Sequence, residues 1–234
     1  MDAARLLEEP IYTPADAARL VRLTPSRVRR WLHGYRDASG PHTRRKHVEA
    51  PPVVRGRRDA NRHEASFLDL IELFMVKALL DHGLSLQKLR RIVNELGRTQ
   101  QIDHPFATKR FYLFGSKLFV QLDESLDTPI LETLTGGQRG ISQVITQCGT
   151  QIDFDRESKL ARSWWPMGKS RRVVVTPERG FGAPTVANRS VKTSNVYDLF
   201  VGEHENVARV ADWLDLSEDE VRDAVEFEQT LAAA

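Results

Sequence analysis

Two Thr-Pro pairs near the amino terminus constrain the fold of this chain more than any other feature of its sequence. Thr13-Pro14 and Thr24-Pro25 each precede a short segment with helical apolar spacing. Threonine caps a helix amino terminus, and proline suits the first helical position because its missing N–H would have no partner there. The apolar residues that recur at helical spacing after the two pairs are Ala17, Leu20, Val21, Val28, Trp31 and Leu32. Two short helices joined by a tight turn, a helix-turn-helix, are therefore predicted.

The charged residues are strongly segregated along the chain, although the net charge is only +2. From position 19 to position 62 there are thirteen lysines and arginines against three acidic residues. From position 198 onward, eleven acidic residues stand against two arginines. A basic helical segment can bind phosphates, and an acidic one repels them. The first segment therefore indicates a nucleic-acid partner, and the last indicates a protein partner.

The second predicted helix and the basic loop after it carry the candidate DNA contacts. On the helix, polar and basic residues lie on or near the face opposite the apolar one, where arginine can bond guanine edges or phosphates. We interpret residues 36–62, in which Val53-Val54 is a possible short strand, as a basic wing that adds phosphate contacts. The predicted DNA-binding residues are Ser26, Arg27, Arg29, Arg30, Arg44, Arg45, Lys46, Arg55, Arg57 and Arg58.

Two further helices are predicted after the wing. Ser66 caps a long one that ends at Gly83, and Ser85 begins another that ends at Gly97. The order helix, turn, helix, wing, helix, together with the sequence of residues 82–86, resembles the winged-helix DNA-binding domain of the MerR family. That resemblance implies that the second helix and the wing touch DNA. The long dimerisation coiled coil of MerR regulators has no counterpart, because no heptad run follows Gly97.

The middle of the chain gives weaker patterns. Residues 111–114 and 118–122 are apolar and flank Gly115-Ser116, which predicts a β-hairpin with a two-residue turn. This hairpin is expected to be buried, either against the helices or across a dimer interface. Gly136-Gly137 and Gly140 are interpreted as a turn, because no Gly-Lys-Ser/Thr follows to make a phosphate loop.

The last third of the chain predicts a strand at Val173–Val175, an irregular turn at residues 181–184, and three helices. The helices begin near Thr193, Val207 and Ser217, and the third starts with a capping box. Their order again suggests a helix-turn-helix shape. The third helix is rich in carboxylates, however, and carboxylates beside a phosphate backbone repel it. We therefore predict that this array binds a protein.

Spaced positions between residues 171 and 228 resemble a small bacterial DUF-type antitoxin domain. They include Val173–Pro177, Phe181-Gly182-x-Pro184, Gly202-Glu203 and Val221-x-x-Ala224-Val225-x-Phe227-Glu228. With the MerR-like head, the whole chain resembles a VapB-type antitoxin of a type II toxin–antitoxin system, close to a mycobacterial one. The resemblance implies two activities: repression of its own operon, and neutralisation of a PIN-like ribonuclease toxin whose carboxylates hold Mg²⁺ or Mn²⁺.

Two modes of toxin binding are open. In one, cations approach the carboxylate site of the toxin, and the candidates are Arg171, Arg172 and Arg179. In the other, the acidic last helix, through Asp223 and Glu226, mimics phosphates in the RNA-binding groove. A stand-alone transcriptional regulator of MerR type is the alternative function.

These patterns predict a mainly α fold with a small β component. The expected domains are a DNA-binding domain over residues 1–100, a hairpin-containing dimerisation region over 101–165 and an antitoxin domain over 166–234. Cys148 is the single cysteine, and the histidines are scattered along the chain. We therefore expect no metal site, no cofactor and no catalytic activity. No apolar run approaches ~20 residues and no secretory stretch begins the chain, which favours the cytoplasm. A homodimer is expected, because operators read by helix-turn-helix dimers are usually pseudo-palindromic.

Overall fold

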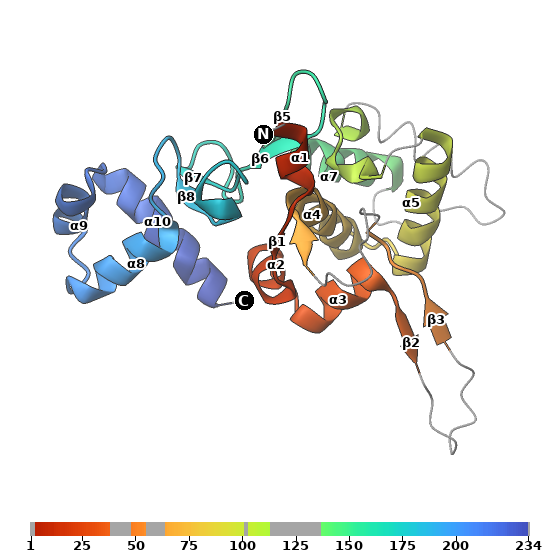
Figure 1. Ribbon diagram of the computed structural model, residues 1–234, viewed down its shortest axis with the longest axis horizontal. Helices are drawn as coiled ribbons and strands as arrows, with labels where there is room; N and C mark the ends of the chain where they lie inside the picture. The colour runs from red at the N-terminus through yellow and green to blue at the C-terminus, as the bar shows by residue number, and fades with distance from the viewer. Residues whose placement is uncertain (1–2, 38–47, 55–63, 101–102, 113–136, 234) are drawn as a thin grey trace, which may run out of the picture.

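The computed structural model describes residues 3–37, 48–54, 64–100, 103–112 and 137–233. The described chain is mainly helical with short antiparallel strand pairs, as predicted (Figure 1). None of its helices is long and apolar enough to cross a membrane.

The predicted helix-turn-helix is present at the amino-terminal end. It consists of α2 (Pro14–Val21) and α3 (Pro25–His33), preceded by α1 (Ala3–Glu8) and β1 (Pro10–Tyr12). The side chain of Thr13 accepts a hydrogen bond from the Asp16 N–H, and the Asp16 carboxylate accepts one from the Thr13 N–H in return. Thr24 caps α3 in the same way, accepting from the Arg27 N–H. Helices α2 and α3 therefore begin at the two Thr-Pro pairs, as predicted.

The wing begins directly after α3. Strand β2 (Tyr35–Asp37) pairs in antiparallel fashion with β3 (Val48–Ala50). Gly34 makes the turn between α3 and β2 with φ +74°, and a Cβ there would lie 2.5 Å from the Ala50 carbonyl oxygen. The strand predicted at Val53-Val54 is wrong. Both side chains are fully buried, and both N–H groups donate to the Trp31 carbonyl at 2.9 and 3.1 Å, which leaves them unavailable for strand pairing.

Helix α4 (Phe67–Asp81) forms the centre of the amino-terminal part. Ser66 caps the helix as predicted and makes a capping box with Asp69, and β4 (Ala65–Ser66) pairs with β1. Helix α5 (Leu86–Gln100) starts where predicted but runs through Gly97, so the predicted stop there is wrong. A glycine inside a helix costs only about 1 kcal/mol relative to alanine, and buried Leu96 beside it holds the helix in place.

The middle segment differs most from the prediction. After a 3₁₀ turn, η1 (Pro105–Ala107), residues 109–112 are helical, so the strand predicted to begin at Phe111 is wrong. Packing decides this conformation, because the Phe111 ring lies 4.7 Å from that of Phe106. The remainder of the predicted hairpin, residues 113–122, lies outside the described residues.

Gly137 and Gly140 are not in a turn, because both lie in the first part of α7 (Gly137–Thr150). The helix is stabilised by a buried stripe at i, i+3, i+4 and i+7 spacing. The members of that stripe are Ile141, Val144, Ile145 and Cys148. This apolar stripe outweighs the weak helix propensity of the glycines.

The carboxyl-terminal part contains the predicted strand and the three predicted helices. Strands β5 (Ile152–Phe154) and β6 (Ala161–Trp164) pair, and β7 (Val173–Val174) pairs with β8 (Thr185–Val186) around a 3₁₀ turn, η3 (Gly180–Gly182). The helices are α8 (Thr193–Gly202), α9 (Val207–Leu214) and α10 (Glu218–Ala232). Ser217 and Glu220 make the predicted capping box of α10.

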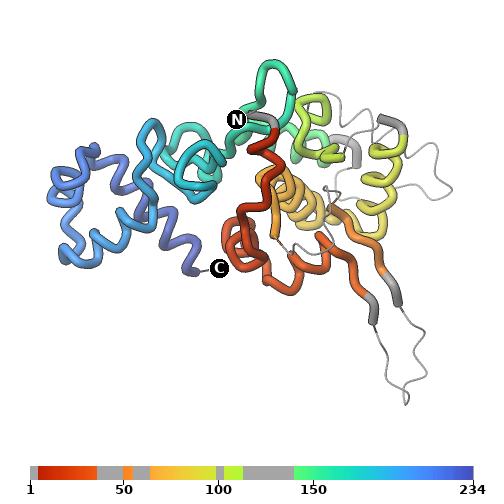
Figure 2. The backbone as a smooth tube through the Cα atoms, viewed as in Figure 1, coloured from red at the N-terminus to blue at the C-terminus, as the bar shows by residue number. Residues whose placement is uncertain are grey.

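Two hydrophobic clusters hold the described chain together. The larger extends from Leu7 to Val175, and the smaller lies among β8, α8, α9 and α10. Helix α10 joins them, because Phe227 and Leu231 near its end pack into the larger cluster. There α10 lies beside α2 (Figure 2), and Arg19 on α2 forms an ion pair with buried Glu228. Helix α10 thus connects the carboxyl-terminal helices to the helix-turn-helix through apolar packing and an ion pair.

Candidate nucleic-acid interface

Helix α3 presents a basic face to solvent because its apolar residues are committed to the core. Val28, Trp31 and Leu32 are buried. The predicted contact residues on the other face, Ser26, Arg27, Arg29 and Arg30, are all exposed. Across the described ranges, none of the arginines in this set, called here the α3 arginines, pairs with a carboxylate. Their charge is therefore available to a ligand.

The amino terminus of α3 adds a second feature suited to phosphate. Ser26 lies at this end, 3.1 Å from the Thr24 hydroxyl, and α3 carries no acidic residue. A helix amino terminus has free N–H groups and a partial positive charge, both of which favour an anion. In helix-turn-helix proteins this end of the second helix reaches the base edges of the major groove. The end of α3 is therefore chemically matched to DNA.

The described part of the wing, β2 and β3, is joined to α3 at both ends. It leaves the helix at Gly34 and returns to it where Val53 and Val54 donate to the Trp31 carbonyl. The Arg30 guanidinium lies 5.5 Å from the centre of the Tyr35 ring, which further joins the helix to β2. In Figure 1, β2 and β3 project away from the body beside α3. The predicted contacts Arg44, Arg45, Lys46, Arg55, Arg57 and Arg58 lie outside the described residues.

The structure brings together four of the predicted toxin-binding residues: Arg171, Arg172, Asp223 and Glu226. Arg171 contacts Asp223 at 2.7 Å and Glu226 at 2.9 Å. The Asp223 carboxylate also accepts hydrogen bonds from the backbone N–H of Arg172 at 2.9 Å and from its Nη1 at 3.3 Å. The side chain of Arg172 also lies 3.5 Å from Asp219. We call this group the Asp223 cluster.

The Asp223 cluster connects the segment before β7 to α10. Asp223 is only 2% exposed, whereas its two arginine partners are about half exposed. The hydrogen bond with Asp223 and the negative charge of Glu226 raise the pKa of the Arg171 guanidinium. The cations and carboxylates that the sequence assigned to two separate binding modes thus neutralise one another.

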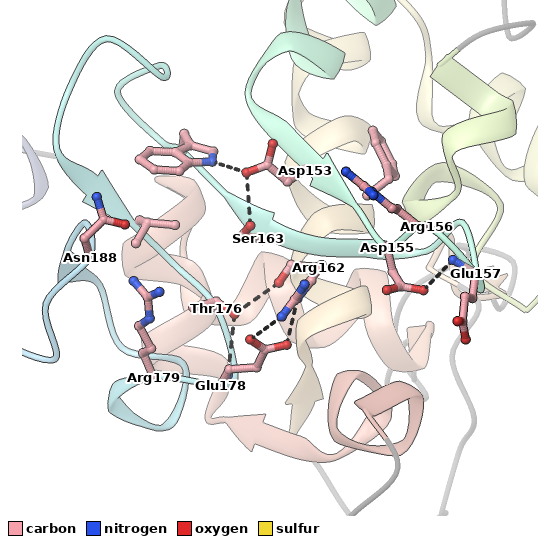
Figure 3. A pocket seen from close by; sticks show the side chains of 13 residues that line it. Asp153, Asp155, Arg156, Glu157, Arg162, Ser163, Thr176, Glu178, Arg179 and Asn188 are labelled. Carbon is pink, nitrogen blue, oxygen red and sulfur yellow. Dashed lines mark hydrogen bonds and ion pairs between the residues drawn. The ribbon is translucent and has the colours of Figure 1, made fainter.

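Arg179 stands apart from that cluster and lines a polar cleft of about 510 Å³ between the β5–β6 hairpin and the segment after β7 (Figure 3). Two of its lining residues, Arg162 and Glu178, form a bidentate ion pair with N–O distances of 2.8 and 2.9 Å. Sequence reasoning missed this cleft. The only local signal is the Asp155 turn, in which the Asp155 carboxylate accepts from the N–H groups of Glu157 and Ser158.

Sequence reasoning also missed a buried carboxyl group in α4. Glu72 is fully buried, and its Oε1 accepts from the Phe106 N–H at 2.6 Å. Burial raises the pKa of Glu72 well above its usual range. Burial also lowers the pKa of His104, whose Nδ1 lies 3.8 Å from Asp69. These groups connect α4 to the η1 segment.

The basic amino-terminal part is similar to a family of DNA-binding domains. Residues 10–93 match the family described as "Putative DNA-binding HTH domain". Over 230 residues, the chain is 23% identical to "Putative antitoxin VapB45" of Mycobacterium tuberculosis, with 93% of each chain covered. It is 21% identical over 237 residues to "Uncharacterized protein Rv2308" of the same organism, covering 97% of this chain and 93% of that protein.

The fold is similar to that of a solved protein from the same organism. The crystal structure of Rv2018 from Mycobacterium tuberculosis matches with a TM-score of 0.71 at 20% identity. The match covers 94% of this chain and 99% of that one. The likeness therefore extends over both hydrophobic clusters, and the mainly helical architecture is shared along nearly the whole length.

Proposed function

We propose that this protein is an antitoxin that represses its own operon and neutralises a PIN-like ribonuclease toxin. The observation that carries the proposal is the exposed basic face of α3, on a helix-turn-helix that is fastened to an acidic three-helix array. The similarity to a relative named as an antitoxin, over 93% of both chains, supports the same combination.

DNA binding would use α3 in the major groove and the wing on the flanking phosphates. The α3 arginines can donate two hydrogen bonds each to guanine or to phosphate, and the helix amino terminus favours an anion. Strand β2 follows Gly34 directly, so the wing strands would lie against the backbone on one side of the groove. A homodimer would place two such helices on a pseudo-palindromic operator.

Toxin binding would use the carboxyl-terminal part. The exposed carboxylates of α10, Glu218, Asp219 and Glu226, are each paired with an arginine. The chain from position 198 onward nevertheless carries eleven acidic residues against two arginines, a balance that disfavours nucleic acid. Helix α10 is attached to α2 of the helix-turn-helix, an arrangement in which one chain could hold a toxin and an operator together.

A stand-alone regulator of MerR type is the second candidate. It is favoured by one observation: the family that matches residues 10–93 is a DNA-binding domain, and no toxin is needed for that role. The two candidates share the operator and differ in the protein partner.

Affinity purification of the tagged chain from its native host, followed by mass spectrometry, separates them. The antitoxin proposal expects a stoichiometric small nuclease that cleaves RNA when isolated and is silenced when this chain is added back. A chain that binds operator DNA in a mobility-shift assay and never recovers a nuclease would be a regulator instead.

A further inference from the structure

Phe181 combines two unfavourable features at one residue. Its side chain is 89% exposed, and its backbone is left-handed, with φ 56° and ψ 43°. A large residue in that conformation is strained, and an exposed aromatic ring forgoes the stabilisation of burial. Neither feature helps the described chain to fold. Together they indicate a side chain held out for contact with another molecule.

The turn that carries Phe181 is held rigidly from both sides. On one side the Tyr12 hydroxyl donates to the Gly182 carbonyl at 2.8 Å, and a Cβ on Gly182 would lie 2.5 Å from that hydroxyl oxygen. On the other side a Cβ on Gly180 would lie 3.0 Å from Thr185 Cγ2. An aromatic anchor displayed on a fixed turn loses little conformational freedom on binding, which favours tight association.

Arg179, two residues earlier, adds charge to the same turn. Its side chain lies at one end of the polar cleft, and Glu157 lies at the other end (Figure 3). Within the ranges that the structure covers, the Arg179 guanidinium pairs with no carboxylate. The neighbouring Arg162, by contrast, is occupied by Glu178.

Two further carboxylates of the cleft are occupied, whereas Glu157, at the end opposite Arg179, pairs with no cation among the described residues. Asp153 accepts from Lys169 at 2.6 Å and from the Trp165 indole at 2.6 Å, and Asp155 is occupied by its own turn. At the end of the cleft nearest in sequence to Phe181, the unpaired charge is therefore the positive charge of Arg179.

We propose that Phe181 and Arg179 form a docking surface for a protein partner that presents an apolar recess beside one or more carboxylates. The ring would fill the recess, and the guanidinium would pair with a carboxylate at its edge. This inference rests on the proposed function, in which the partner is a ribonuclease with a carboxylate active site. It assigns the contact to the turn before β8, because Arg171 and Arg172 are already engaged in the Asp223 cluster.

The surface can be tested by placing a photocrosslinking residue, p-benzoylphenylalanine, at position 181 of the full chain in its native host. The same residue at position 213 serves as the control, because Trp213 is also an exposed aromatic (58%) but lies on the regular helix α9. We expect position 181 to crosslink to a nuclease and position 213 to give no such product.

Affinities for the purified partner then measure the contribution of each side chain. Phe181→Ala is expected to weaken binding by at least about 30-fold, as for an interface hot spot, and Arg179→Glu by a comparable factor. Trp213→Ala and Arg189→Glu are the matched controls, since Arg189 is a half-exposed arginine paired with Asp215. Both controls should stay within about 2-fold, and all four variants should keep their operator affinity.

The outcomes separate this inference from the proposed function. Equal affinity of wild type and Phe181→Ala for a captured nuclease overturns the docking surface and leaves the antitoxin function standing. A crosslink from position 181 to a second copy of this chain also overturns it. If the crosslink is to a protein that is not a nuclease and no nuclease is captured, the antitoxin function is refuted; the surface then stands only if Phe181→Ala and Arg179→Glu weaken binding of that protein, and unchanged affinity overturns it. The absence of any crosslink from position 181 overturns the surface.

Discussion

Replacement of Asp223 by alanine should lower the free energy of unfolding by about 3 kcal/mol. The Asp223 carboxylate is 2% exposed and accepts three hydrogen bonds, the shortest two at 2.7 and 2.9 Å. The bond from the Arg172 N–H to a charged acceptor is expected to contribute about 1.5–3 kcal/mol. The arginine side chains add less because they are about half exposed. Alanine returns about 0.5 kcal/mol through its better helix propensity.

The measurement is urea unfolding followed by circular dichroism, with Glu226→Gln as the matched control. Glu226 contacts the same Arg171, but its side chain is 52% exposed, so its replacement should cost less than about 0.5 kcal/mol. If the urea midpoint of Asp223→Ala is no lower than that of Glu226→Gln, the structural role of the Asp223 cluster is refuted. If the prediction holds, loss of toxin binding in an Asp223 variant reports a weakened fold, and Glu226 is the residue that tests an acidic interface.

Three further predictions concern other parts of the chain. Replacing all α3 arginines by alanine should weaken operator binding, measured by fluorescence anisotropy. It should also reduce the slope of log K against log [salt] by up to about 2.7, because each lost phosphate contact removes about 0.9. The control Arg98→Ala on α5, where Arg98 is paired with Glu95, should change neither the affinity nor the slope. Burial raises the pKa of Glu72, so its stabilising contribution is complete below the unfolded-state pKa near 4.5 and is lost as pH rises toward the folded-state pKa. Glu72→Gln should flatten that decline in thermal melts as the pH rises above about 4.5, and an unchanged pH profile would contradict the assignment. Phe181→Gly should raise the free energy of unfolding by about 0.5–1 kcal/mol, because glycine adopts the left-handed conformation without strain. The control Trp213→Gly should lower the free energy of unfolding by a similar amount, because glycine is unfavourable inside helix α9.

Local sequence determined where the helices of the two functional ends begin. The caps at Thr13, Thr24, Ser66 and Ser217 all formed as predicted, because a cap depends on groups within three residues of one another. The exposure of the α3 arginines followed from the same local information, since three buried apolar residues fix which face of a short helix meets solvent. The mainly helical class and the helix-turn-helix were therefore readable from the sequence.

Tertiary structure decided the middle of the chain and the state of the carboxyl-terminal candidates. Gly97 and the glycines of α7 lie inside helices because packing of the neighbouring apolar residues outweighs their local preference. The pairing of Arg171 with Asp223, and the isolation of Arg179 from that cluster, join or separate residues some fifty positions apart. Such pairings depend on which faces of distant elements meet. Side-chain spacing along the chain gives the direction of a residue on its own helix or strand, but it carries no information about the opposite partner.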